Sequence, residues 1–227
     1  SSCEEIWEEC IRGNGNITTE TRTLSTFDRI EVNGDFDVEV DTGAEPQLWL
    51  NTDENLMDFV VTHVSGNRLV IEERDDYRLK PTRTIRVKVT APALSALELH
   101  GSGHLYCNGV AADALDLAVE GSGNLECFNA DVSLLSCSLE GSGSITGSAA
   151  AESLTGRIEG SGEIRLTGEA ASSELQVIGS GHIRASQWYT NVCVAYISGS
   201  GNIDTHVAGS LDVTIIGSGM VYYSGNP

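Results

Sequence analysis

Three glutamates in the C-terminal half recur at a spacing that could bring their carboxylates together. Glu120, Glu140 and Glu159 lie 20 and 19 residues apart, and each directly precedes a Gly-Ser-Gly tripeptide. Carboxylates gathered on one outer face serve polysaccharide lyases and hydrolases, and they are also ligands for calcium. If the three point outward about 4.8 Å apart, they repel one another unless a cation lies among them. The column is therefore a candidate calcium site, and the alternative is a solvated acidic stripe.

A second group that could bind a ligand is aromatic. Trp188 and Tyr189 lie in segment 186–191, where other repeats have small polar loops, and Tyr196 follows on the outward side of the next expected strand. Aromatic faces beside polar groups suit contact with carbohydrate or protein, because they contribute a large area at little entropic cost. These three residues are the candidate ligand contacts, and the alternative is a loop that covers one end of the core.

Other catalytic patterns lack support in the spacing. His104 and His182 occupy equivalent positions but stand four repeats apart, about 19 Å, and the histidines have no Cys or carboxylate at ligand spacing. The serines of the Gly-Ser-Gly tripeptides lack a regular His or Asp partner, so a Ser-His-Asp nucleophile is unsupported. The pattern indicates a protein that is not an enzyme and needs no cofactor, with calcium as the one candidate ion.

These candidates depend on a repeat that organises the second half of the chain. The Gly-Ser-Gly tripeptide starts at Gly101, Gly121, Gly141, Gly160, Gly179, Gly199 and Gly217. Intervals of 18 to 20 residues are typical of a solenoid, in which each repeat is one coil stacked on the last. Apolar residues alternate on both sides of each tripeptide, with the period of a strand that buries one face. We expect an all-β fold, a right-handed parallel β-helix with coils of about 18–20 residues.

The first 94 residues are β-rich but less regular. Apolar residues alternate in segments 28–40, 47–51, 67–72 and 84–90, and residues 30–38 resemble a degenerate repeat with Gly34 at its corner. An uncapped stack leaves an open sheet edge that is prone to pairing. We therefore divide the chain into a tail (residues 1–12), irregular first coils that also cap the solenoid (13–94), and the regular β-helix (95–227). A separately folded first half is the alternative.

The repeat also sorts four of the cysteines. Cys107 and Cys127 share an inward column in adjacent coils, within reach of a disulfide, and the alternative is a pair of stacked core thiols. Cys137 and Cys193 occupy different columns several coils apart. They cannot bond to each other, and we expect them to be buried free thiols.

The N-terminal sequence Ser1-Ser2-Cys3 looks like the end of a bacterial lipoprotein signal, in which a small residue precedes the cysteine that is lipidated. Cys3 is therefore the candidate for a lipid anchor. A disulfide between Cys3 and Cys10, or two loose thiols, is the alternative. Both the lipid anchor and the disulfide place the protein outside the cytoplasm.

The composition excludes some classes of partner. The chain has 227 residues, of which 33 are acidic and 13 basic, for a formal net charge of −20. Nucleic acids and anionic membranes need clustered Lys and Arg, so neither is expected as a partner. No apolar run approaches the roughly 18 residues of a transmembrane helix, and no signal peptide is seen, which a mature or a trimmed chain would lack.

Several segments together resemble a known family. They begin at Gly13 (GNGNI), Thr19 (TETR), Phe27 (FDRIEVNGDFDV), Asp53 (DENL) and Val89 (VTAP), and the Gly-Ser-Gly corners follow them. The sequence resembles the auto-transporter-adhesin "head GIN domain" family of Gram-negative bacteria from about Gly13 to Pro227. The resemblance implies the fold and an adhesive role, and it carries over no catalytic residues.

Three hypotheses about function follow. The first is a binding or adhesion module at the cell surface, outer membrane or periplasm that presents its sides to glycan or protein. The second is a carbohydrate-active enzyme that uses the acidic column. The third is a structural envelope protein whose solenoids pack side by side or end to end, as a homo-oligomer. The rigid repeat, the acidity and the aromatic segment favour the first.

Overall fold

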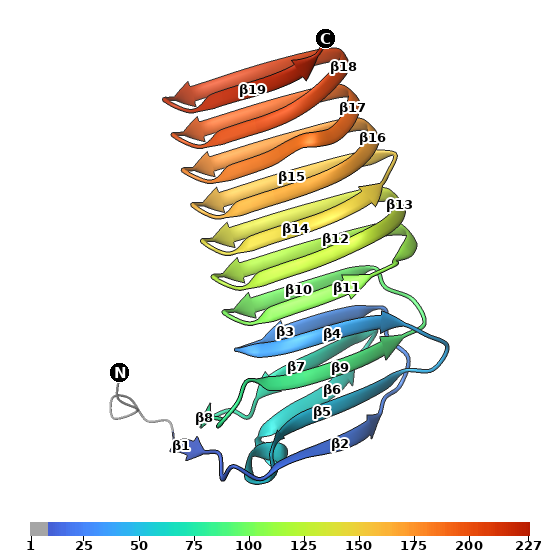
Figure 1. The fold of residues 1–227 in the computed structure, drawn as a ribbon, viewed down its shortest axis with the longest axis vertical. Helices are drawn as coiled ribbons and strands as arrows, with labels where there is room; N and C mark the ends of the chain where they lie inside the picture. The colour runs from blue at the N-terminus through green and yellow to red at the C-terminus, as the bar shows by residue number, and fades with distance from the viewer. Residues whose placement is uncertain (1–8) are drawn as a thin grey trace.

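The computed structural model describes residues 9–227, and its C-terminal part is a regular stack of strands (Figure 1). These strands are β10 (Ala96–Gly101), β11 (His104–Asn108), β12 (Ala111–Gly121), β13 (Asn124–Gly141), β14 (Ser144–Ala150), β15 (Ser153–Gly160), β16 (Glu163–Gly179), β17 (His182–Gly199), β18 (Asn202–Gly217) and β19 (Met220–Gly225). All pairings among them are parallel. The predicted parallel β-solenoid is confirmed.

Each coil turns sharply on one side and gently on the other. The sharp side is the Gly-Ser-Gly corner. On the other side, long strands such as β13 and β17 continue around a rounded turn into the next coil (Figure 1). The two flat faces of the coil enclose a core of apolar side chains, with Leu99, Val119 and Leu139 stacked in register and at most 1% exposed.

The corner needs glycine at both ends. Gly121 has a φ of +117°, in the region that favours glycine, and a Cβ there would lie 2.6 Å from the carbonyl oxygen of Gly101. At Gly143, a Cβ would lie 2.2 Å from the carbonyl oxygen of Gly123. The same close approach lets the amides of Ser122 and Gly123 donate hydrogen bonds to the Gly101 oxygen, each at 2.9 Å. The corners therefore hold the coils together.

The N-terminal half is built from shorter elements. They are β1 (Glu9–Arg12), β2 (Ile17–Thr23), β3 (Arg29–Asn33), β4 (Phe36–Thr42), β5 (Gln47–Asp53), the 3₁₀ helix η1 (Glu54–Phe59), β6 (Val60–Ser65), β7 (Arg68–Glu73), β8 (Tyr77–Lys80) and β9 (Ile85–Ala91). β3 and β4 form a coil with Gly34 at its corner (φ +135°), in parallel register with β10 and β11. The degenerate repeat predicted over residues 30–38 is confirmed.

The order of coils along the stack departs from the order in the sequence. β3 and β4 pair on one side with β10 and β11, and on the other side with β7 and β9, all in parallel. The first coil in the sequence is therefore the second in the stack. Antiparallel strands follow beyond it: β6 pairs with β7, while β5 pairs with β9 and β2 with β5.

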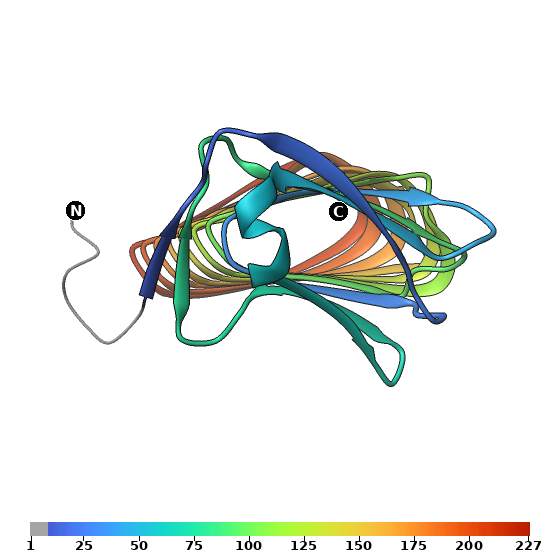
Figure 2. The ribbon, with the colours of Figure 1, turned by 90° about the horizontal axis from the view of Figure 1, so that it is seen from below.

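This end of the stack is closed. Figure 2 looks along the solenoid and shows η1 lying across the end of the coils. Leu56 and Met57 of η1 are buried and join the core. A separate parallel pair, β1 with β8, lies beside this end. No helix within residues 9–227 is long and apolar enough to cross a membrane.

Candidate functional site

The three glutamates before the corners stack in one column, as the repeat predicts. Glu120, Glu140 and Glu159 are paired in register on the outer surface. His100 continues this column, and its Nδ1 lies 3.0 Å from Oε2 of Glu120. At the other end, the guanidinium of Arg157 pairs with Glu159.

The register determines how the three carboxylates project. Side chains in one column of a parallel sheet project side by side, so their oxygens do not converge on one point. In the part of the chain that the structure describes, no group of three or more His, Cys, Asp or Glu residues is placed to hold a metal ion. The column is an acidic stripe with the imidazole of His100 at one end and the guanidinium of Arg157 beside the other.

Trp188 corrects the aromatic prediction, because it is fully buried and cannot contact a ligand. Its indole Nε1–H donates a hydrogen bond to Oγ of Ser173, at 3.2 Å. In the preceding coil it lies beside Gly168. In the following coil, Ala185 and Tyr189 pair with the consecutive residues Thr205 and His206, so residues 186–188 have no counterpart there. The large side chain fills the space of the shorter turn.

The two predicted tyrosines lie apart. Tyr189 is 56% exposed at the rounded turn. Tyr196 is half-buried on a flat face, between Gln176 and Thr214 of the neighbouring coils. The two tyrosines are seven residues apart along β17, one at the rounded turn and the other on a flat face.

Tyr189 belongs to a column of outward residues along the rounded turns, which we call the turn column. It consists, in register, of Ala111, Asp131, Ala150, Glu169, Tyr189, His206 and Ser224. The rings of Tyr189 and His206 meet edge to face with centroids 4.7 Å apart. Nδ1 of His206 lies 2.9 Å from Oγ of Ser224, so the imidazole is held in place from both sides.

Three hollows adjoin this column and share lining residues. Their volumes are about 700, 550 and 420 Å³. The first hollow, of about 700 Å³, shares Asp131 and Ala150 with the second, of about 550 Å³. The second shares Glu169 and Tyr189 with the third, of about 420 Å³. Together they form one shallow channel along the rounded turns, which we call the turn groove. Its base is made largely of Ala130, Ala149, Ala151, Ala170, Ala171 and Gly168.

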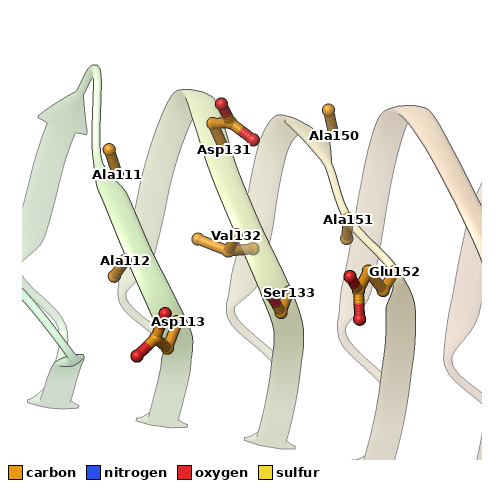
Figure 3. A pocket seen from close by; sticks show the side chains of 9 residues that line it. All are labelled: Ala111, Ala112, Asp113, Asp131, Val132, Ser133, Ala150, Ala151 and Glu152. Carbon is orange, nitrogen blue, oxygen red and sulfur yellow. The ribbon is translucent and has the colours of Figure 1, made fainter.

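The walls of the turn groove are acidic and polar. Figure 3 shows Asp113, Asp131 and Glu152 around the first hollow, contributed by neighbouring coils. Farther along, Glu169 and Asn191 stand beside the Tyr189 ring. No Lys or Arg is among the described residues that line the groove. The groove therefore offers hydrogen-bond acceptors and one aromatic face, and it repels anions.

The sequence prediction found Tyr189 but missed the acidic residues and the histidine of this column. Asp131, Glu169 and Tyr189 follow their corner glycines by ten, nine and ten residues, so alignment on the corners could have found them. His206 follows its corner glycine by only seven residues, because its turn is shorter. No pattern in the sequence predicts where the turn before His206 becomes shorter.

The cysteines lie away from the groove. Cys107 and Cys127 pair in register as predicted, and both are free thiols, so the disulfide that the register allows is not formed in the structure. A hydrogen bond with Cys127, together with burial, raises the pKa of the Cys107 thiol. Burial also raises the pKa of Cys137, and these protonated thiols serve as core residues.

The proposed lipidation residue, Cys3, lies outside the described residues.

Comparisons with known proteins agree with the fold. A family model with the description "Putative auto-transporter adhesin, head GIN domain" matches residues 26–227. No curated protein matches the sequence significantly.

Three solved structures are similar over nearly their whole length. A "putative adhesin" from Parabacteroides merdae has a TM-score of 0.85 at 20% identity, with 95% of this chain and 99% of that chain covered. A "putative adhesin" from Bacteroides fragilis has a TM-score of 0.83 at 19% identity, with 94% and 99% covered. A "Putative lipid binding protein" from Parabacteroides distasonis has a TM-score of 0.78 at 28% identity, with 95% and 99% covered. At identities near 20%, the first two show the fold alone.

Proposed function

Because this chain belongs to the "Putative auto-transporter adhesin, head GIN domain" family, we propose that it is a binding module that acts outside the cytoplasm and holds glycan chains along its turn groove. The observation that carries the proposal is the exposed Tyr189 ring, held by His206 beside the carboxylate of Glu169 and the amide of Asn191. An aromatic face packs against the C–H face of a sugar ring, and the adjacent acceptors bind its hydroxyl groups.

The shape and charge of the groove narrow the class of glycan. A shallow channel that crosses several coils suits a chain of sugars better than a single small molecule, which pockets enclose. Four carboxylates, those of Asp113, Asp131, Glu152 and Glu169, line the channel, and the whole chain carries a net charge of −20. Repulsion disfavours sulfated and uronic-acid polysaccharides, so the ligand is a neutral glycan.

The binding is non-catalytic in this proposal. The turn column alternates carboxylates with alanine, so Asp131 and Glu169 are separated by two coil spacings, about 10 Å. That separation is well beyond the roughly 5–5.5 Å between the two carboxyl groups of retaining glycosidases. A release of reducing sugar ends from a bound neutral polysaccharide would overturn this part of the proposal.

The test is binding of neutral polysaccharides on a glycan array by the intact protein and by Tyr189→Ala. We expect the substitution to weaken binding by about tenfold, the effect of losing one aromatic contact. Because Tyr189 is exposed, the unfolding temperature should stay nearly unchanged. Tyr196→Ala is the matched control, since this tyrosine lies on the same strand but away from the groove.

The outcomes are distinct. Weakening by Tyr189→Ala alone supports the turn groove. Equal binding by the wild type and Tyr189→Ala excludes it, and weakening only by Tyr196→Ala places the contact on the flat face. Labelling of cells stripped of their outer membrane with a membrane-impermeant reagent checks the location, and a protein that is labelled only after lysis contradicts a location outside the cytoplasm.

A further inference from the structure

The C-terminal end of the solenoid is unlike every other part of its surface. The last coil consists of residues 210–217 of β18 and the strand β19. Residues 210–217 pair only with β17, and β19 pairs only with β18, so the outer edges of both strands are unpaired within the described residues (Figure 1). An exposed parallel edge of this kind is a template for pairing with another strand.

Apolar side chains cover this edge. Val213 and Ile215 stand in columns that are buried in the other coils, and here they are 40% and 41% exposed because no coil covers them. Tyr223, in the same column as the buried Cys107 and Cys127, is 61% exposed. Within residues 9–227, no further strand covers this end of the core.

The outward positions of the last coil are apolar as well. Met220 follows Asn202 in its column, and Tyr222 follows Asp204. In earlier coils these two columns hold polar or charged residues almost throughout, as in Glu163, which stands in the column of Met220. Met220 and Tyr222 contact each other and are about half exposed. A soluble surface rarely gathers this much exposed apolar area without a partner.

The C-terminal end has far fewer charged residues than the rest of the molecule. Charged residues make up 20% of the chain, yet the 23 residues from Thr205 to Pro227 contain one, Asp212. Two copies of a protein with a net charge of −20 repel each other over most of their surfaces. At the last coil this repulsion is weakest, and contact with a second copy would bury the most exposed apolar area there.

We propose that the C-terminal end of the solenoid binds the C-terminal end of a second copy of this chain. The opposite end offers no comparable apolar surface, because η1 covers the core there with the buried side chains of Leu56 and Met57. A two-fold axis perpendicular to the solenoid brings the last coils together, and under such an axis the edge strands meet antiparallel. Each edge then supplies donors and acceptors to the other, and the two open cores become one.

This inference does not depend on glycan binding. The resulting dimer is one long solenoid closed at both ends, with a turn groove on each half. Its two-fold symmetry also stops growth, because a head-to-tail contact would leave a free end and continue into a fibre.

The test is sedimentation equilibrium of the intact protein and of Tyr223→Asp. We expect the wild type to approach twice the chain mass of 24.1 kDa as its concentration rises. The variant places an unpaired carboxylate in the closed interface, so its dimer dissociation constant should rise by a factor on the order of 100. Because Tyr223 is exposed in the single chain, the variant should still fold, which circular dichroism checks.

A second variant and a control make the result specific. Tyr222→Asp should weaken the dimer as well, because like charges then face each other across the edge. Thr146→Asp is the matched control, since Thr146 stands in the same outward column in an inner coil, and it should leave the dimer unchanged. A mass of 24.1 kDa at every concentration overturns the proposal, as does a dimer that survives both variants at the end.

Discussion

Asp53 is fully buried, and its carboxylate receives three hydrogen bonds from the chain around it. Oδ1 accepts from the amide of Gly15 at 2.7 Å and from Oγ1 of Thr82 at 2.8 Å, and Oδ2 accepts from the amide of Thr82 at 2.9 Å. Burial alone would raise the pKa of Asp53, but the hydrogen bonds from Thr82 and Gly15 outweigh it and lower the pKa. One side chain thus fastens the segment before β2 and the loop before β9 to the closed end.

We predict that Asp53→Asn destabilises the protein at neutral pH by about 1–3 kcal/mol, because an amide cannot accept all three bonds. The folded-state pKa is lowered, so the stabilisation is present above the unfolded-state value of about 3.9 and is lost as the pH falls through the folded-state pKa. Thermal melts at neutral pH and below about pH 4 measure the effect. The gap between wild type and variant should narrow in acid.

The control is Asp58→Asn, which removes an exposed carboxylate of η1 and should leave the melting temperature nearly unchanged at each pH. A gap for Asp53→Asn that is the same at both pH values contradicts a role for the ionised carboxylate.

Trp188 shows where residue-level prediction fails. Its neighbours in sequence are polar, and segment 186–191 has the composition of an exposed loop. The structure extends β17 through this segment, and a register shift against β16 turns the indole inward. A one-residue shift exchanges the two faces of a strand, so the exposure of such residues cannot be predicted without knowing where the shift falls.

At the scale of elements, the corner is the feature that the sequence predicts best. Its glycines recur at a nearly fixed interval, and the structure requires each of them for a positive φ or a close approach. The strands on either side follow from apolar alternation. The pairing of the N-terminal strands is harder to predict, because alternating apolar residues fit a parallel and an antiparallel neighbour equally well. β9, for example, pairs in parallel with β4 and antiparallel with β5.

We predict that Gly141→Ala is among the most destabilising small substitutions in the solenoid. Its φ of +117° and a Cβ only 2.3 Å from the carbonyl oxygen of Gly121 force the backbone to shift, at a cost of at least about 1–3 kcal/mol. Urea unfolding measures the loss. The adjacent Ser142→Ala, at an exposed position, should change the free energy of unfolding by no more than about 0.5 kcal/mol. Equal effects at the two positions would falsify the steric account.

At the scale of the whole molecule, the net charge of −20 opposes the compact state. We predict that the melting temperature rises as sodium chloride increases from low to physiological ionic strength, because the Debye length shortens from about 30 Å to about 8 Å. Choline chloride should have the same effect if screening is the cause.

Calcium serves as the discriminating salt. At matched ionic strength, calcium chloride should add little beyond sodium chloride, since the described residues form no metal-holding group. A rise in melting temperature that saturates at low calcium concentration would instead reveal a bound ion.

The position of the first coil has a consequence for how the chain folds. β3 and β4 appear early in the sequence, yet both of their neighbours in the stack come later, β7 with β9 on one side and β10 with β11 on the other. In a solenoid, each added coil is templated by the one beside it. The first coil in the sequence therefore cannot be completed on either side until later residues are made: its short side needs β7 and β9, and its long side needs β10 and β11 before the coils up to Gly225 can follow.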